Sequence, residues 1–141
     1  MKTRYTPLKV ALVGIVVAMV VLWAIGQVQA TTGLLDGKTF VGPTGEKGKE
    51  AEGEDELRFE NGMLVSVGCA EWGFGASDYQ AKVEGDTINF TSEMTSAKHG
   101  KIVWNGTVKG DTIDATYVWT KKRWYWKDAH QEKWLKGTVK K

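Results

Sequence analysis

The sequence predicts an all-β domain, an eight-stranded antiparallel up-and-down barrel, behind an N-terminal signal or anchor helix. Apolar and polar side chains alternate with a period of two beyond Asp55, and dipeptides suited to two-residue hairpin turns recur at Asn61-Gly62, Gly85-Asp86 and Gly110-Asp111. No helical pattern beyond the leader offers a layer to cover the apolar face of such a sheet. Closing the sheet on itself buries that face and removes the open edges. A partly open barrel or a sandwich is the alternative.

The leader, residues 1–30, has the three parts of a secretory signal. The first nine residues carry three basic side chains, Val10–Ile25 is almost purely apolar, and small or modest residues precede an expected cleavage after Ala30. An uncleaved anchor is the alternative, although 16 apolar residues are fewer than the roughly 20 that span a bilayer. Either outcome predicts export, so that 31–141 is periplasmic or extracellular, free or tethered to the inner membrane by residues 10–30.

Charge and composition exclude several function classes for residues 31–141, which we expect to form a single domain. The whole chain has 19 basic and 17 acidic residues. Three of the basic residues belong to the leader, so the remainder is nearly neutral and lacks the basic character of a nucleic-acid-binding domain. One Cys and two His argue against a disulfide scaffold and a zinc or multi-histidine site. We therefore expect no metal and no cofactor.

Most of the expected strands are joined by short connections. The segment Gly42–Glu56 is an exception, since it is rich in glycine and charged residues, and we expect a solvated loop there. Its acidic residues lack the Asp-x-Asp-x-Asp-Gly spacing of a calcium loop. The expected strands span 38–42, 55–60, 63–69, 78–84, 87–95, 101–109, 111–120 and 132–139.

The turns can be tested by the faces that they create. Closing Gly85-Asp86 and Gly110-Asp111 as two-residue loops collects apolar, aromatic and small residues on one face of each hairpin. The other face is polar except for Val103 and Val118. The last strand likewise places Leu135, Gly137 and Val139 on one side. The facing pairs are Val83 with Ile88, Ala81 with Phe90, Tyr79 with Ser92, Val108 with Ile113, Gly106 with Ala115, Trp104 with Tyr117, and Ile102 with Trp119.

The Asn61-Gly62 hairpin is less regular. It places Leu57 and Phe59 with Leu64 and Ser66 on the inner face, but it leaves three apolar residues outside. We expect a bulge or a longer loop to correct this pattern. The three residues left outside are Met63, Val65 and Val67.

In strand number, size and export signal, residues 38–139 resemble small exported bacterial barrels of the lipocalin-like or calycin-like type. The resemblance is one of architecture: lipocalins proper carry Gly-x-Trp in the first strand, and Gly37-Lys38-Thr39-Phe40 has no Trp. It implies that a small apolar molecule binds inside the barrel.

The inward-facing set mixes large aromatic residues, small residues and hydroxyls. Such a set can leave a cavity in which the hydroxyls orient a ligand. Alternatively, Trp104 and Trp119 fill the space, and the little volume that eight short strands enclose favours a filled core. The candidate ligand-binding residues are Ser66, Tyr79, Phe90, Ser92, Trp104, Tyr117 and Trp119.

A second candidate site is the basic, aromatic segment between the last two strands. Exposed Trp beside Lys and Arg suits a membrane or cell-envelope surface, and the candidate contact residues are Arg123, Trp124, Trp126 and Lys127. The alternative, which we favour, is a long hairpin whose aromatics cover one end of the barrel.

The remaining reactive residues show no enzymatic pattern. Cys69 is expected to be a small buried hydrophobe, and His99 and His130 to lie in exposed turns or loops. No nucleophile elbow, phosphate loop or His-Glu-x-x-His occurs. We expect a non-catalytic exported protein that binds a small apolar ligand within the barrel. The alternative is a packed interaction module of the cell envelope that acts through its Trp-rich surface.

Overall fold

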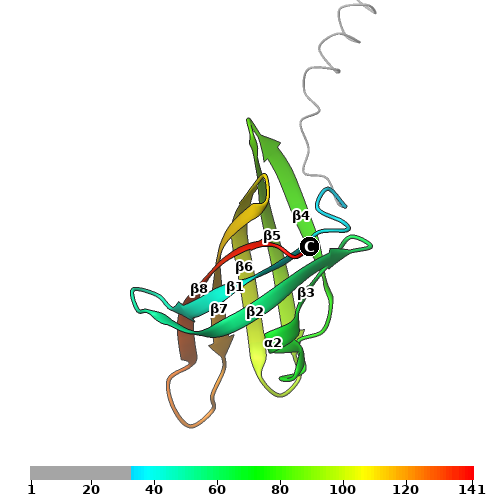
Figure 1. Ribbon diagram of the computed structural model, residues 1–141. Helices are drawn as coiled ribbons and strands as arrows, with labels where there is room; N and C mark the ends of the chain where they lie inside the picture. The colour runs from blue at the N-terminus through cyan, green and yellow to red at the C-terminus, as the bar shows by residue number, and fades with distance from the viewer. Residues whose placement is uncertain (1–32) are drawn as a thin grey trace, which may run out of the picture.

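The computed structural model describes residues 33–141, which form a closed antiparallel barrel of eight strands in up-and-down order (Figure 1). The last strand pairs with the first, so the predicted fold class is confirmed and the sheet has no free edge. The predicted signal or anchor helix lies outside the described residues. The strands are β1 (Thr39–Glu46), β2 (Ala51–Glu60), β3 (Met63–Ser66), β4 (Ser77–Glu84), β5 (Thr87–Ser96), β6 (Gly100–Lys109), β7 (Thr112–Lys121) and β8 (Ala129–Val139), with a four-residue helix α2 (Val67–Ala70) after β3.

The predicted register of the two regular hairpins is confirmed. Tyr79 faces Ser92 across β4 and β5, and Trp104 faces Tyr117 across β6 and β7. The glycines of the turns, Gly85 and Gly110, have φ of 62° and 56°, a left-handed conformation that a glycine adopts without steric cost.

The expected bulge at Asn61-Gly62 is wrong, because this hairpin also closes as a two-residue turn. Phe59 faces Leu64 and Leu57 faces Ser66 across β2 and β3, and all four side chains are fully buried. Met63 is exposed on the outer face. A single-layered barrel has no second sheet or helix over its outside, so isolated apolar side chains there meet water without disturbing the register.

The expected loop Gly42–Glu56 is also wrong. β1 continues to Glu46 and β2 begins at Ala51, so that only residues 47–50 form the turn. Gly42 permits a close approach of β8: a Cβ built there would lie 2.0 Å from the carbonyl oxygen of Lys136. The glycines that suggested a loop therefore include one that allows the barrel to close.

Two strand limits differ from the prediction near the lower end of Figure 1. The strand expected over 63–69 ends at Ser66, whose side chain accepts a hydrogen bond from the backbone N–H of Cys69 and caps α2. The last strand begins earlier than expected, at Ala129, so His130 is an exposed strand residue rather than a loop residue.

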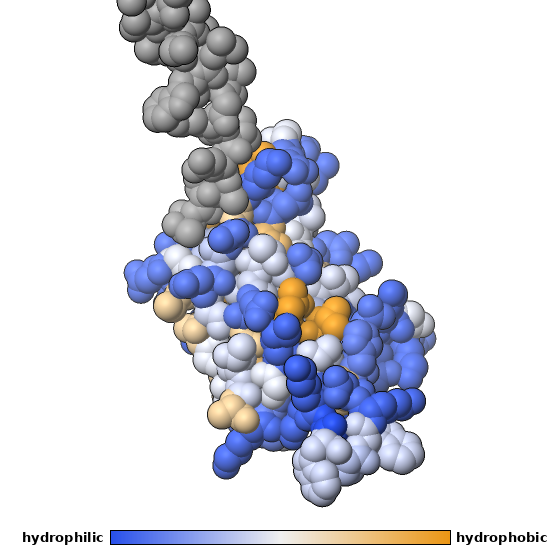
Figure 2. Space-filling view, turned by 180° about the vertical axis from the view of Figure 1, so that it is seen from behind, coloured by the Kyte–Doolittle hydropathy of each residue, from blue (hydrophilic) through white to orange (hydrophobic). Residues whose placement is uncertain are grey.

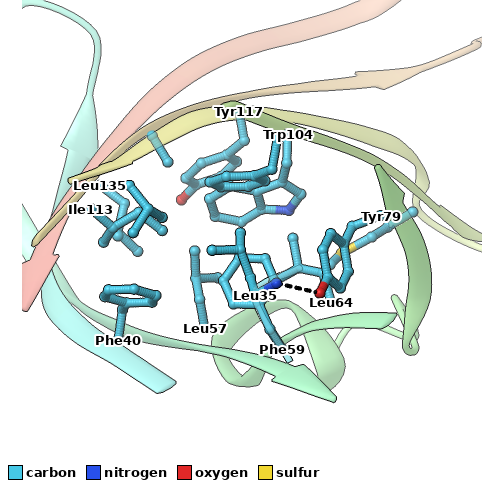
Figure 3. Close-up of a cluster of buried hydrophobic side chains, with 14 of the residues drawn as sticks. Leu35, Phe40, Leu57, Phe59, Leu64, Tyr79, Trp104, Ile113, Tyr117 and Leu135 are labelled. Carbon is cyan, nitrogen blue, oxygen red and sulfur yellow. Dashed lines mark hydrogen bonds between the residues drawn. The ribbon is translucent and has the colours of Figure 1, made fainter. Parts of the chain in front are cut away.

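One end of the barrel is closed by the chain segment that precedes β1. Leu35 inserts into the barrel and is fully buried, while its neighbour Leu34 remains 37% exposed. The backbone N–H of Leu35 donates to the Tyr79 hydroxyl at 2.9 Å, as Figure 3 shows. That hydroxyl donates in turn to the Asp36 carboxylate at 2.7 Å, and the carboxylate also accepts from the backbone N–H of Gly62. These bonds hold in place the segment 33–38, which we call the plug.

Aromatic rings fill the space beneath this plug. Phe59 makes edge-to-face contacts with Phe40, Tyr79 and Phe90 at centroid distances of 6.1, 5.0 and 5.1 Å. Trp104 is fully buried and stacks on Tyr117 with a centroid distance of 4.2 Å (Figure 3). This half of the barrel is therefore a solid core. Of the two tryptophans that the filled-core alternative names, Trp104 belongs to this core, whereas Trp119 is only partly buried against it.

Candidate ligand-binding cavity at the barrel mouth

The opposite end of the barrel, which we call the mouth, contains a cavity of about 490 Å³. The mouth is the end at which α2 and the β5–β6 and β7–β8 connections lie in Figure 1. Ligand sites commonly occupy 300–1,000 Å³, so the cavity has the size of a small-molecule site. Its lining combines aromatic and apolar side chains with a few polar ones: Thr44, Glu54, Asp55, Gly68, Cys69, Trp72, Phe74, His99, Ile102, Tyr117, Trp119, Gln131 and Lys133.

One wall of the cavity is α2, and Asp55 on β2 fixes its position. The Asp55 carboxylate is buried and accepts hydrogen bonds from the Ser66 hydroxyl and, at 2.8 Å, from the backbone N–H of Gly68. It also accepts from the backbone N–H of Glu56 at 2.7 Å. These bonds hold the turn that presents Cys69 to the cavity, so Asp55 organises the wall while its own acceptors are largely occupied.

Tyr117 is one of the polar residues of the lining, and its hydroxyl is paired with that of Thr44. The Thr44 hydroxyl donates to the carbonyl oxygen of Trp134 at 2.7 Å, so the Tyr117 hydroxyl, 3.2 Å from Thr44, is the donor in that second pair. The phenol oxygen then retains lone pairs that can accept a hydrogen bond from a ligand. Burial raises the pKa of Tyr117 to about 12, so the group stays a neutral phenol at physiological pH.

The aromatic wall joins Trp119 of β7 to two irregular segments, the β5–β6 turn and the loop after α2. The indole N–H of Trp119 donates to the carbonyl oxygen of His99 at 2.6 Å. The His99 ring lies edge-to-face with Trp72 at 5.4 Å, and the Ser96 hydroxyl donates to the Trp72 carbonyl oxygen. The β5–β6 turn and the loop after α2 are thereby joined into one rim.

The electrostatic environment of the cavity is acidic. Burial raises the pKa of the Cys69 thiol, and the charge of Asp55 adds to the increase. The charges of Asp55 and Glu52 also raise the pKa of Tyr117, after burial. Lys133 is the basic residue of the lining, and its ammonium group is paired with Glu52. A bound anion would therefore meet repulsion that is only partly compensated.

The structure divides the sequence-predicted ligand set into two groups. Tyr117 and Trp119 line the cavity. Ser66, Tyr79, Phe90, Ser92 and Trp104 are buried away from it: the serines bond to Asp55 and to the Asp78 carbonyl oxygen, and the three rings belong to the solid core.

Sequence reasoning missed several of the cavity residues. Trp72 and Phe74 lie in an irregular segment where no alternation marks an inner face. The sequence predicts a solvated loop at Asp55, whereas the structure places this residue in β2 and in the cavity lining. Cys69 was expected to be a buried hydrophobe, and it is instead partly exposed to the cavity. The one local signal of this site in the sequence is the segment from Ser66 to Cys69, a Ser-x-x-Cys turn that directly follows a strand of alternating residues.

The predicted surface site, Arg123, Trp124, Trp126 and Lys127, projects from the molecule. Trp124 is 95% exposed, and Tyr125 and Trp126 are each 66% exposed. The favoured expectation that these aromatics cover one end of the barrel is therefore wrong. The connection between β7 and β8 is seven residues long and bends outward from the mouth. The alternation of inward-facing and outward-facing side chains along β7 therefore does not continue into it.

Comparison of the chain with protein-family models, with curated proteins and with solved structures found no match. The closed eight-stranded antiparallel barrel is compatible with a lipocalin-like fold. Within residues 33–141 the structure contains no helix with the length and apolar character needed to cross a membrane. The same part of the chain holds no cluster of three or more His, Cys, Asp or Glu side chains arranged for a metal ion.

Proposed function

We propose that this protein is an exported, non-catalytic binding protein that holds a small, uncharged apolar ligand in the cavity at the barrel mouth. The observation that carries the proposal is the contrast between the two ends of one barrel: a solid aromatic core under the Leu35 plug, and about 490 Å³ of open volume at the mouth. A lipocalin-like architecture supports it by analogy.

The lining defines the class of ligand. Trp72, Phe74, Ile102 and Trp119 offer apolar and aromatic contacts for a ring system or a short hydrocarbon body. The Tyr117 oxygen offers an acceptor for one N–H or O–H donor of the ligand. The acidic surroundings disfavour a carboxylate or sulfonate, so the preferred ligand is neutral.

Two dyes that share a skeleton and differ in charge test this class. N-phenyl-1-naphthylamine is neutral with one N–H donor, and 8-anilino-1-naphthalenesulfonate is its anionic counterpart. We expect saturable fluorescence enhancement with the neutral dye and about tenfold weaker binding of the anion, since each tenfold corresponds to about 1.4 kcal/mol. Equal affinity for both dyes would contradict the electrostatic part of the proposal.

Neighbouring residues of α2 provide a matched pair of variants. Cys69→Trp places a large side chain in the cavity, whereas Val67→Trp adds the same side chain at an exposed position of the same turn. We expect C69W to abolish dye binding and V67W to retain it. Binding that is equal in both variants would place the dye outside the cavity.

A measurement on the unaltered chain tests the same site without depending on whether the variants fold. Cys69 is the single cysteine of the protein, and it is one of the residues that line the cavity. Saturating neutral dye should slow alkylation of Cys69 by a maleimide reagent. An unchanged alkylation rate at saturating dye would count against the cavity as the binding site.

A further inference from the structure

The connection between β7 and β8 presents a basic, aromatic surface that the cavity does not use. Together with Lys121, the last residue of β7, this connection forms the segment 121–128, which includes four basic side chains, one acidic side chain and three consecutive aromatic residues. We name this segment the aromatic loop. Its most exposed side chain, Trp124, lies edge-to-face with Tyr125 at 5.3 Å, so the loop holds its rings against each other and offers them to solvent.

The loop projects from the mouth of the barrel. Figure 1 shows the β7–β8 connection at the lower end of the molecule, away from the end where the described chain begins and terminates. In Figure 2 a pale projection emerges among blue, hydrophilic side chains at the lower end of the molecule. A protruding tip of this kind inserts into a soft, extended surface more readily than it encloses a single compact molecule.

We propose that the aromatic loop docks the barrel mouth onto an anionic lipid surface. Trp and Tyr are the side chains that favour the membrane–water interface, since each has an apolar ring and a polar atom. Lys121, Lys122, Arg123 and Lys127 surround these rings with positive charge, which is complementary to anionic headgroups. The occupant is therefore a lipid bilayer rather than a soluble partner.

The loop is continuous with the cavity. An open groove beside it is lined by Arg123, Trp126 and Lys127, and Trp119 and Gln131 line both this groove and the cavity. A loop docked on lipid would bring the cavity entrance to the headgroup layer, where apolar small molecules concentrate. Docking itself does not require that the cavity bind a ligand, so the two proposals can fail separately.

Hydrogen exchange of the full chain tests docking at the loop itself, whatever other segment touches the vesicle. The probes are vesicles of phosphatidylcholine alone and of phosphatidylcholine mixed with phosphatidylglycerol. We expect the backbone amides of residues 121–128 to exchange several-fold more slowly on the anionic vesicles and at an unchanged rate on the neutral ones.

Matched variants assign the effect to rings and charges. Trp124→Ser with Trp126→Ser should remove the protection. Lys122→Gln with Arg123→Gln should raise the lipid concentration needed for half-protection about 25-fold, at about fivefold per charge. Lys82→Gln with Lys109→Gln removes two exposed charges from the other end of the barrel and should change nothing.

Two results would overturn the proposal. One is an exchange rate at 121–128 that is the same with and without anionic vesicles. The other is protection of the loop by a soluble acidic polysaccharide but not by vesicles, which would assign the loop to a cell-wall polymer. Slow exchange of the backbone amides in β5, β6 and β7, read in the same experiment, reports that the barrels of the variants remain folded.

Discussion

The plug at the closed end offers a sharp test of the fold, because two adjacent leucines have opposite environments. Leu35 is fully buried inside the barrel, whereas Leu34 is 37% exposed. Replacing a buried Leu by Ala loses the transfer free energy of the removed atoms and leaves a cavity, which together cost roughly 2–5 kcal/mol. Leu35 has core residues on its inner side and is tied by its own backbone to Tyr79, so the site has little freedom to collapse.

We therefore expect Leu35→Ala to reduce the free energy of unfolding by about 3 kcal/mol and Leu34→Ala to reduce it by less than about 0.5 kcal/mol. Urea unfolding of the full chain, followed by tryptophan fluorescence, measures both. The midpoint should fall for L35A with an unchanged m value, because the exposed area of the unfolded chain is nearly the same. A loss below about 1 kcal/mol for L35A, or equal losses for both variants, would mean that the segment before β1 does not close the barrel.

Three further outcomes follow from the packing and from the titratable groups. Gly42→Ala should destabilise the barrel by about 2 kcal/mol or more, because its Cβ would lie 2.0 Å from the Lys136 carbonyl oxygen, while Gly53→Ala, with no atom within 4 Å of its Cβ, should be nearly neutral in the same urea assay. Burial raises the pKa of Tyr79 and Tyr117 to about 12, so the folded chain keeps protons that the unfolded chain releases from pH about 10. Stability should therefore fall between pH about 10 and 12, and Tyr117→Phe should lessen the fall by on the order of 2 kcal/mol; an identical pH profile for the variant would contradict the burial of its hydroxyl. Burial also raises the pKa of the Cys69 thiol, so maleimide alkylation at neutral pH should be slower than that of a free cysteine peptide and should accelerate as the pH rises; a rate equal to that of the peptide would contradict this environment.

The regular part of the fold could be predicted because its signals are local. The alternation of apolar and polar residues and a turn dipeptide together fix the register of a hairpin. Once the register is known, so is the full set of side chains on its inner face. Trp104 was thereby set opposite Tyr117, as the structure has it. Barrel closure followed from the need to bury that face and pair the edges.

The irregular part could not be predicted, because its causes are contacts between distant residues. Leu35 is part of a short apolar run in the sequence, and only the Tyr79 hydroxyl, 44 residues away, shows why it is inside. Gly42 suggested a loop because the approach of β8 is not visible in a local window. The exposure of Trp124 departs from the usual burial of tryptophan, so average residue behaviour does not predict it.

The cavity itself was predicted only in part. The alternation of residues identifies Tyr117 and Trp119 as inward-facing. It does not show how far along the barrel axis each inward side chain lies, so residues of the core and of the cavity could not be told apart. Depth depends on where the plug sits and on how α2 and the loop after it frame the mouth. Those elements have no periodic pattern, and therefore Trp72 and Cys69 entered the site only with the structure.

The most direct test is to locate the neutral naphthylamine dye on the full chain by nuclear Overhauser contacts. Contacts from the dye protons to Ile102, Phe74 and Trp119 would place it in the mouth cavity, as proposed. Contacts to Phe40 or Phe59, or to outward-facing side chains of the strands, would contradict a barrel that is solid at one end and open to ligand at the other.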